Sequence, residues 1–411
     1  MKNLALLALV ASCLALPALA GEGAVPTGVP HVDHVFVIMM ENHAYGQIVG
    51  NPDAPFANNY MKAANSATNY FAVGHPSAPN YLEIVGGSNF GLSNDYWPNW
   101  FGLGCIDNAP GSTGCANAFT PISATGTDNT VVATAVNSSQ CNGQVTISGT
   151  PATYNCARYN YQAAYFTPKS IADQLVHKGL SWKSYQESLP TVVPGAFGVN
   201  YSDGAYSSMS PVAVFGPGAV QKLYAVKHNP FAYFQNIETG DNPALSFSRI
   251  QDFDGPDGLW ADLQHPERTP NFSFIVPNQC HDMHGGVSGG TFICSTKTAA
   301  ETGYLMLEGD AQVVKIINGI KNSPVWSRGH NAIILVWDEN DYSDAANRVV
   351  FLSETNYAAN GVKSQAPYDH FSLLRTLEVG FGIPCLNHAC DQTSVVMNEL
   401  FGGAGQEQQS P

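Results

Sequence analysis

The stretch VFVIMMEN, Val35 to Asn42, decides the fold because six consecutive apolar residues lead directly into a carboxylate and an amide. A run of this length, rich in Val and Ile, is typical of a strand buried on both faces in the middle of a parallel sheet. In open α/β sheets, ligands bind at the carboxyl ends of the strands. Glu41 and Asn42 are therefore candidate site residues.

The same pattern occurs twice more in the chain. The segment NAIILVWDEN, residues 331–340, is a second apolar run, and it ends in Asp338 and Glu339. A third, NFSFIVPN, residues 271–278, ends in Asn278. Any one of these could be a strand that runs into an ordinary polar turn. Three strands that bring oxygen-bearing side chains to one sheet edge favour a metal or phosphate site.

Apolar stripes with helical spacing alternate with these strands. They predict helices in SIADQLVHKG, residues 170–179, in GDAQVVKIINGIKNSP, residues 309–324, and in HFSLLRTLEVGFG, residues 370–382, the last closing at Gly380. Alternation of strands and helices indicates an α/β fold with a mainly parallel sheet and helices on both faces.

The length and composition set the domain organisation. With 411 residues, 44% of them hydrophobic, the chain could form one elaborated α/β domain or two domains. We expect a single domain over residues 21–411, with loop insertions at about 93–165 and 189–220, where the composition changes to Gly, Ser, Thr, Asn, Pro and Tyr. These insertions either cover the sheet edge passively or select the substrate.

Residues 1–20, MKNLALLALVASCLALPALA, have the pattern of a secretory signal peptide: one Lys, an apolar centre and a closing Ala-Leu-Ala. The segment is too short to span a membrane stably. A lipoprotein cleavage site ending at Cys13 is the alternative interpretation. Either way, we expect a secreted or periplasmic protein.

The charge balance excludes some partners. The formal net charge is −15, and removal of Lys2 with the signal segment leaves 16 of the 17 basic residues against 32 acidic ones. Nucleic acids and anionic membrane surfaces would repel such a chain.

Eight cysteines remain after the signal segment, and an even number fits disulfides in an oxidising compartment. Structural zinc is disfavoured because no two cysteines form a CxxC pair. Proximity in sequence predicts the pairs Cys105–Cys115, Cys141–Cys156, Cys280–Cys294 and Cys385–Cys390.

The segment GHPSAPNYLEIVGG, residues 74–87, carries the strongest chemical signal. Pro79 is suited to the first turn of a helix, which would put the Ser77 hydroxyl at the helix N-terminus. The N–H groups there bind phosphate oxygens, and the helix dipole stabilises a seryl alkoxide. The alternative is that Ser77 only caps the helix.

Six motifs occur in order along the chain: MEN at the end of the first strand, HPSAPNYL, PNQCHDMH, GDA, VWDEN and PYDHFSLLRTLEVGFGIP. In these motifs the chain resembles the bacterial phosphoesterase family of the alkaline phosphatase superfamily, which includes secreted acid phosphatases and phospholipases C. The resemblance covers about Val35 to Leu400, apart from the insertions.

The resemblance implies that Ser77 is a nucleophile that forms a phosphoserine intermediate. It also implies one divalent metal ion, with ligands from Glu41, Asn42, Ser77, Asp338 and Glu339. Oxygen ligands of this kind suit calcium, magnesium or manganese as readily as zinc, so the metal stays open. Two-zinc relatives have Asp followed by His where this chain has Asp338 and Glu339, which puts a second zinc in doubt.

The family motifs also contain histidines. By resemblance, protonated histidines would bind the phosphoryl group and protonate the leaving oxygen, best at mildly acidic pH; the candidates are His75, His284 and His370. Three further residues are expected to orient these groups from behind: Asn278, His281 and Asp282.

The resemblance implies a secreted metal-dependent phosphoric ester hydrolase, of acid phosphatase type, that acts on phosphomonoesters. A phospholipase C or a phosphoinositide phosphatase acting on lipid headgroups is the alternative, and a non-catalytic binding protein a more distant one. The partner is a phosphorylated small molecule or a phospholipid headgroup. The aromatic group Tyr96, Trp97, Trp100 and Phe101 either packs internally or contacts lipid.

Overall fold

The part of the chain that the computed structural model describes comprises residues 22–90, 168–189, 220–234, 236–237, 240–285 and 299–403, the single residues Leu92, Asp95 and Cys294, and strands at 133–137, 144–147, 150–153, 162–166 and 212–214. No helix within these residues is both long and apolar enough to cross a bilayer. Several predicted features lie outside them: the signal segment at 1–20, the aromatic group Tyr96, Trp97, Trp100 and Phe101, and the cysteines Cys105, Cys115, Cys141 and Cys156.

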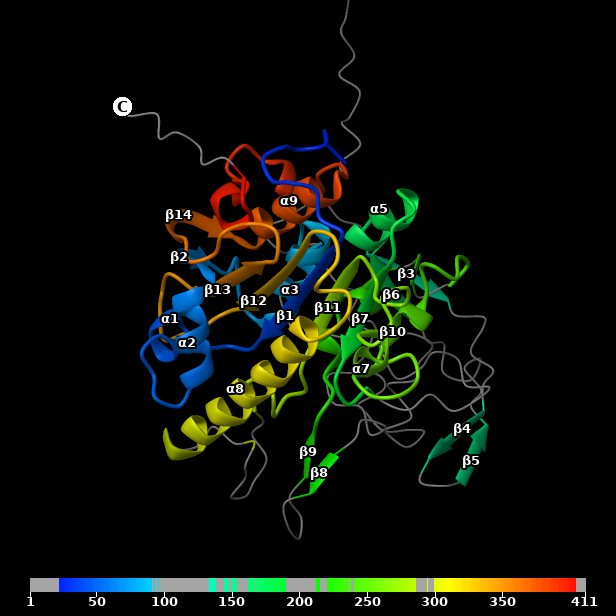
Figure 1. The fold of residues 1–411 in the computed structure, drawn as a ribbon. Helices are drawn as coiled ribbons and strands as arrows, with labels where there is room; N and C mark the ends of the chain where they lie inside the picture. Colours follow the sequence, from blue (N-terminus) through cyan, green and yellow to red (C-terminus); the bar gives the residue numbers. More distant parts are fainter. Residues whose placement is uncertain are drawn as a thin grey trace, which may run out of the picture.

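An eight-stranded sheet forms the centre of the structure (Figure 1). In spatial order its strands are β10 (Ile250–Gln251), β7 (Trp182–Gln186), β11 (Phe272–Val276), β1 (His34–Met40), β12 (Asn331–Trp337), β13 (Arg348–Thr355), β2 (Asn65–Phe71) and β14 (Lys363–Asp369). All neighbours pair in parallel except β13, which is antiparallel to both β12 and β2. The predicted mainly parallel sheet is confirmed.

The register of the two central strands places their polar ends side by side. Met40, the last residue of β1, pairs with Trp337, the last residue of β12. The main-chain N–H of Asp338 then donates to the carbonyl of Met40 across 3.0 Å. Because the strands are parallel, Glu41 and Asp338 emerge at the same carboxyl edge of the sheet.

Helices cover both faces of the sheet, as predicted. Within the described residues, the helices are α1 (Tyr45–Ile48), α2 (Pro55–Ala63), α3 (Ser77–Gly86), α5 (Ile171–His177), α7 (Leu259–Asp262), α8 (Ala299–Lys321) and α9 (His370–Phe381). α8 crosses one face and packs on α2, whereas α3 lies on the other face and packs on α9 and α5 (Figure 1). β12 is buried along its whole length, which explains its unbroken apolar sequence.

Two helix boundaries differ from the sequence prediction. α8 begins at Ala299, ten residues before the predicted start at Gly309. α9 continues through Gly380 and ends at Phe381, and the C-cap residue Gly382 has the left-handed conformation (φ 60°) that glycine adopts without a steric penalty. Within the helix, Gly380 packs closely against Val32: a Cβ there would lie 2.8 Å from the Val32 side chain, so the position favours glycine.

Short elements complete the described chain. The small hairpins pair β3 (Ala133–Asn137) with β6 (Gln162–Phe166), β4 (Gln144–Ile147) with β5 (Thr150–Thr153), and β8 (Val212–Val214) with β9 (Val220–Lys222). The 3₁₀ turns are η4 (Val226–His228), η5 (Pro230–Tyr233), η6 (Phe247–Arg249), η7 (Asn387–Cys390) and η8 (Asn398–Phe401). The predicted disulfides Cys280–Cys294 and Cys385–Cys390 are both present.

Candidate active site

Ser77 is the first residue of α3, and its side chain is almost completely buried. Pro76 occupies the N-cap position, so the Ser77 hydroxyl does not cap the helix. Instead, Ser77 Oγ lies 3.0 Å from Glu41 Oε2 and 3.1 Å from Glu339 Oε1. The helix start thus brings the serine hydroxyl to the carboxyl edge of the sheet, between the ends of β1 and β12.

Three carboxylates, those of Glu41, Asp338 and Glu339, are buried around this edge. Burial raises the pKa of Glu339 to about 8 and the pKa of Asp338 well above its usual value, and the Glu41 carboxylate raises both further. Burial also opposes ionisation of Glu41, but the neighbouring His228 and Lys227 outweigh it and hold the Glu41 pKa well below its usual range. Without a cation, Asp338 and Glu339 therefore hold their protons more tightly than free carboxyls do, and a bound cation would favour their ionised forms.

Lys227 and His228, in the 3₁₀ turn η4, complete the site, and the sequence analysis missed both. Lys227 Nζ lies 3.4 Å from Ser77 Oγ and 3.1 Å from His284 Nε2, and its side chain is only 6% exposed. The signal available in the sequence was a Lys-His pair inside the apolar, aromatic segment YAVKHNPFAYF in a chain with only 17 Lys and Arg residues. A basic pair in such surroundings is buried only when it has partners.

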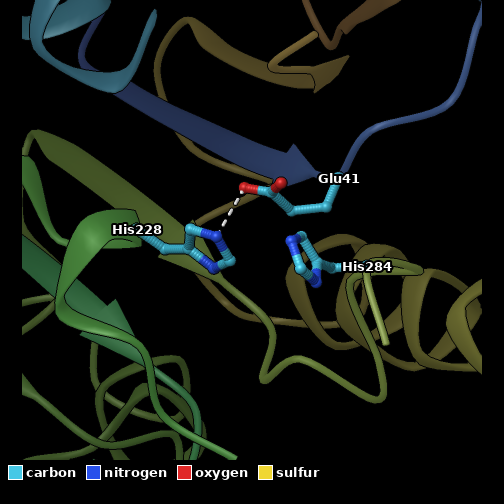
Figure 2. Close-up of side chains that lie close together, drawn as sticks. All are labelled: Glu41, His228 and His284. Carbon is cyan, nitrogen blue, oxygen red and sulfur yellow. Dashed lines mark ion pairs between the residues drawn. The ribbon is translucent and has the colours of Figure 1, made fainter. Parts of the chain in front are cut away.

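His228 lies between two carboxylates. Its Nε2 is 3.0 Å from Glu41 Oε1, and its Nδ1 is 3.4 Å from Asp282 Oδ2. Figure 2 shows the Glu41 side chain at the tip of β1, with the rings of His228 and His284 below the carboxylate in this view. Burial lowers the pKa of His228, but the two carboxylates more than compensate and raise it to about 9. His228 is thus the protonated histidine of the site.

His284 is neutral, in contrast to the expectation of a protonated, phosphate-binding histidine. Its Nδ1 donates to the Gly285 carbonyl across 2.5 Å, which leaves the Nε2 lone pair facing the Lys227 ammonium. Burial and the nearby Lys227 charge lower the pKa of His284 to about 4. An uncharged Nε2 can accept a hydrogen bond or bind a metal, but it cannot donate a proton.

The two other predicted histidines differ in their surroundings. His75 pairs through Nδ1 with Glu339 Oε2 and stacks on Tyr342 at 4.0 Å between ring centroids. His370 is fully buried, and both of its ring nitrogens contact protein groups: Nε2 the Asp338 carbonyl and Nδ1 the Tyr70 hydroxyl. We therefore correct the catalytic role expected for His370 to a positioning role, because neither nitrogen faces Ser77.

The turn after β11 contains the three residues expected to orient the catalytic and metal-binding groups: Asn278, His281 and Asp282. Asp282 Oδ1 accepts from the main-chain N–H of His284 across 2.7 Å, while its other oxygen faces His228. Asn278 Oδ1 accepts from the main-chain N–H of His281, whose ring in turn pairs with Glu187. Asp282 thus fixes the site histidines directly, and Asn278 and His281 shape the turn.

The predicted metal ligands fit a cation by their chemistry. Ser77 has one hydroxyl hydrogen and touches two carboxyl groups, so when both are ionised one of these contacts sets two acceptor oxygens about 3 Å apart. Both carboxylate oxygens of Asp338 are buried and lack any hydrogen-bond partner among the described residues. Asn42, half-buried, follows Glu41 at the same strand end. A cation among these groups would relieve the repulsion and satisfy the orphaned oxygens.

A second group of potential ligands overlaps the first. Glu41, His228 and His284 offer ligand atoms that all lie within 4.8 Å of one another. Asp282 faces Nδ1 of His228, which is how a carboxylate commonly orients a metal-binding histidine. This mixed set could bind a metal only after His228 loses its proton, because a protonated imidazole has no lone pair. The oxygen-rich set needs no such change at a histidine, and Glu41 belongs to both sets.

A mainly parallel sheet with a serine and three carboxylates at its carboxyl edge places the protein among the α/β enzymes. The model of the Phosphoesterase family matches residues 51–384, and the chain belongs to that family. The protein is therefore a phosphate ester hydrolase.

Three relatives show how far the similarity extends. A phosphatidylinositol-3-phosphatase from Mycobacterium tuberculosis is 24% identical over 385 residues, which cover 93% of this chain and 88% of that protein. A probable acid phosphatase from Kluyveromyces lactis is 23% identical, and the match covers 85% of this chain and 58% of the yeast protein. Among solved structures, a protein in the alkaline phosphatase superfamily from Vibrio parahaemolyticus is 13% identical with a TM-score of 0.46, covering 93% of this chain and 74% of that one.

Proposed function

We propose that the protein is a secreted, metal-dependent acid phosphatase that hydrolyses phosphomonoesters through a phosphoserine intermediate. The observation that carries this proposal is the position of Ser77: a buried serine at a helix N-terminus, with its Oγ between Glu41 and Glu339. Ser77 Oγ attacks phosphorus, the bond to the leaving alcohol breaks, and water then hydrolyses the phosphoserine.

Glu41, Asp338, Glu339 and Ser77 would hold the metal ion, with Asn42 beside them. When bound, the metal supplies positive charge that lowers the pKa of the serine hydroxyl and neutralises the phosphoryl group. The residues themselves set the geometry: the Asp338 carbonyl is held by His370, and His228 pairs with Glu41. These contacts fix the carboxylates on both sides of Ser77.

The phosphomonoester assignment rests on the relatives. The Kluyveromyces lactis relative is named a probable acid phosphatase, and the mycobacterial one is named a phosphatidylinositol-3-phosphatase. Both names describe removal of a terminal phosphoryl group. A phosphoinositide headgroup is the second candidate substrate, because the match to the mycobacterial protein covers most of both chains.

The variant Ser77→Ala tests the nucleophile. We expect the rate on a chromogenic phosphomonoester to fall roughly 10⁴-fold or more, because no other group replaces the hydroxyl. Ser327→Ala is the matched control, since Ser327 is an exposed serine whose hydroxyl contacts only the carbonyl of Pro324. Wild-type activity in Ser77→Ala would show that the assigned nucleophile is wrong.

Metal dependence is tested by binding as well as by activity. Chelation should abolish hydrolysis, and readdition of one divalent metal should restore it. Asp338→Asn should weaken metal binding, measured by calorimetry, while Asp254→Asn at an exposed aspartate should not. Full activity of a metal-free preparation would contradict the ligand assignment.

Rates on a phosphomonoester, a phosphoinositide and phosphatidylcholine, compared side by side, decide the substrate class. The main proposal predicts fastest hydrolysis of the monoester at acidic pH. Preferential hydrolysis of the phosphoinositide would favour the second candidate, and cleavage of phosphatidylcholine at an equal or higher rate would favour a phospholipase C.

Secretion is supported by the disulfides. Cys280–Cys294 and Cys385–Cys390 are typical of an oxidising compartment and agree with the signal-like sequence of residues 1–20. Detection of the mature chain outside the cytoplasm, with a new N-terminus near Gly21, tests this part of the proposal.

A further inference from the structure

The Asp95 carboxylate contacts two groups that adjoin the proposed nucleophile. Its Oδ1 accepts from the main-chain N–H of Ala78 across 3.1 Å, and its Oδ2 lies 3.3 Å from Lys227 Nζ. Ala78 is the residue after Ser77 in the first turn of α3, and Lys227 Nζ also contacts Ser77 Oγ. Two hydrogen-bond donors, a main-chain N–H and a lysine ammonium, are thus bound by one anionic side chain.

The groups that bind Asp95 are those that an incoming phosphoryl group needs. A free N–H at a helix N-terminus and a lysine ammonium both bind phosphate oxygens. The Ala78 N–H and the Lys227 ammonium come from separate elements, α3 and η4, and meet at the Asp95 carboxylate, while Lys227 Nζ also lies 3.4 Å from Ser77 Oγ. The Asp95 carboxylate, with two oxygens on one carbon, occupies that position as part of a phosphate would.

Asp95 also adds to a charge conflict in the site. Its carboxylate adds to the three buried carboxyl groups of the sheet edge, those of Glu41, Asp338 and Glu339. A phosphoryl dianion that entered with Asp95 in place would face this carboxylate as well as those of the metal-binding edge. The Asp95 side chain is 31% exposed, whereas that of Lys227 is 6% exposed, so Asp95 is the member of the pair that can leave toward solvent.

We propose that Asp95 is a built-in competitor of the substrate: its carboxylate occupies the phosphoryl-binding position between the Ala78 N–H and the Lys227 ammonium, and the substrate must displace it. This inference rests on the proposed function, in which Ser77 attacks the phosphoryl group. Asp95 thereby sets the affinity of the site for phosphate, and the enzyme releases its product phosphate more readily than the same site without Asp95.

How much Asp95 weakens phosphate binding depends on the fraction of molecules in which its carboxylate occupies the position between the Ala78 N–H and the Lys227 ammonium. If the free, binding-competent form is about one tenth of the total, the apparent Kd for phosphate is about tenfold weaker than the intrinsic one. We therefore expect Asp95→Ala to bind inorganic phosphate about tenfold more tightly and to show a lower KM for a phosphomonoester. Asp95→Asn should lie between wild type and Asp95→Ala, because the amide still accepts from Ala78 but lacks the negative charge.

The experiment is calorimetric titration of the full-length, metal-loaded protein with inorganic phosphate, together with the inhibition constant of phosphate in the hydrolysis assay. Asp241→Ala is the matched control, because Asp241 is exposed and its removal changes the net charge equally. Lys227→Met should weaken phosphate binding roughly tenfold or more, with or without Asp95→Ala. Unchanged or weaker phosphate binding in both Asp95 variants, with thermal unfolding as in wild type, would overturn the proposal.

The same titration in the Ser77→Ala background separates this inference from the proposed function. Phosphate binding there needs no turnover, so the Asp95→Ala effect remains measurable in an inactive protein. If Ser77→Ala is inactive but Asp95→Ala does not tighten phosphate binding in that background, only the role of Asp95 is refuted. An active Ser77→Ala variant refutes the proposed nucleophile, whatever the binding data show.

Discussion

The His370 ring holds the main chain of Asp338 in place: His370 Nε2 lies 2.6 Å from the Asp338 carbonyl oxygen. Since a carbonyl only accepts, Nε2 carries the proton, and Nδ1 accepts from the Tyr70 hydroxyl across 2.9 Å. Burial lowers the pKa of His370 to about 4, in agreement with this neutral form. The first residue of α9 thereby positions the end of β12, where the proposed metal ligands lie.

This contact predicts a difference between two substitutions of His370. The amide of His370→Gln can still donate to the Asp338 carbonyl, so we expect metal affinity close to that of wild type. His370→Phe leaves the carbonyl without a donor, and we expect metal binding to weaken by roughly 10- to 100-fold, as is usual for residues that orient metal ligands. Calorimetric metal titration measures both, and equal affinities for the two variants would refute the positioning role.

His228 is expected to matter for stability as well as for the site. Because the ring lies between Glu41 and Asp282, the variant His228→Gln leaves at least one buried carboxylate unpaired. Removal of one partner of a buried ion pair costs about 3 kcal/mol. Urea unfolding of the metal-free protein should show this loss, whereas His31→Gln at an exposed histidine should change little. A loss below about 1 kcal/mol would mean that His228 is uncharged in the folded protein.

The two disulfides should contribute differently. Cys280–Cys294 closes a segment of sequence separation 14 that includes His281, Asp282 and His284, whereas Cys385–Cys390 closes one of separation 5. Chain-entropy arguments give about 3 kcal/mol for the longer loop and about 2 kcal/mol for the shorter one.

We therefore expect the double variant Cys280→Ser/Cys294→Ser to lose both stability and activity. Cys385→Ser/Cys390→Ser, the matched control, should lose stability alone. Denaturant unfolding and the rate on a phosphomonoester measure the two effects, and full activity without Cys280–Cys294 would show that this bridge does not hold the histidine turn.

Asp252 gives a pH-dependent prediction outside the site. Burial raises its pKa to about 6, although its carboxylate accepts hydrogen bonds from the main-chain N–H groups of Ser188 and Phe253. A carboxyl with a raised pKa binds its proton more tightly in the folded state, so the protein loses stability as pH rises from about 4 to about 6.

Asp252→Asn should remove that loss. We expect the difference in unfolding free energy between the variant and wild type to be about 1 kcal/mol more favourable to the variant at pH 8 than at pH 4. This is less than the whole pKa shift of Asp252 would give, because solvent screens this partly exposed carboxyl group. Thermal unfolding at the two pH values checks the sign. A gain that is larger at pH 4 than at pH 8 would contradict the raised pKa.

The sequence predicts the parts of the site that lie on regular elements. Glu41 and Glu339 were found because buried strands end just before them, and Ser77 because a proline-rich motif starts a helix there. Because β1 and β12 pair in parallel, their carboxyl ends lie at the same edge of the sheet, which brings Glu41 and Glu339 together.

Lys227, His228 and Asp95 could not be predicted in the same way. The first two lie on a 3₁₀ turn with no periodic pattern, and Lys227 is separated from Ser77 by 150 positions in the sequence. Asp95 belongs to a segment whose composition indicates only a loop. The role of His370 is not predictable from its motif, because a motif shows that a histidine is present but not which way its ring nitrogens face.

Acid-quench trapping of the reaction intermediate tests the central claim most directly. A metal-loaded enzyme mixed with a phosphomonoester and quenched in acid during turnover should carry one phosphoryl group, and peptide mass spectrometry should place it on Ser77. The Ser77→Ala variant should carry none. Phosphorylation of a histidine, or of another residue with Ser77 unmodified, would contradict the account.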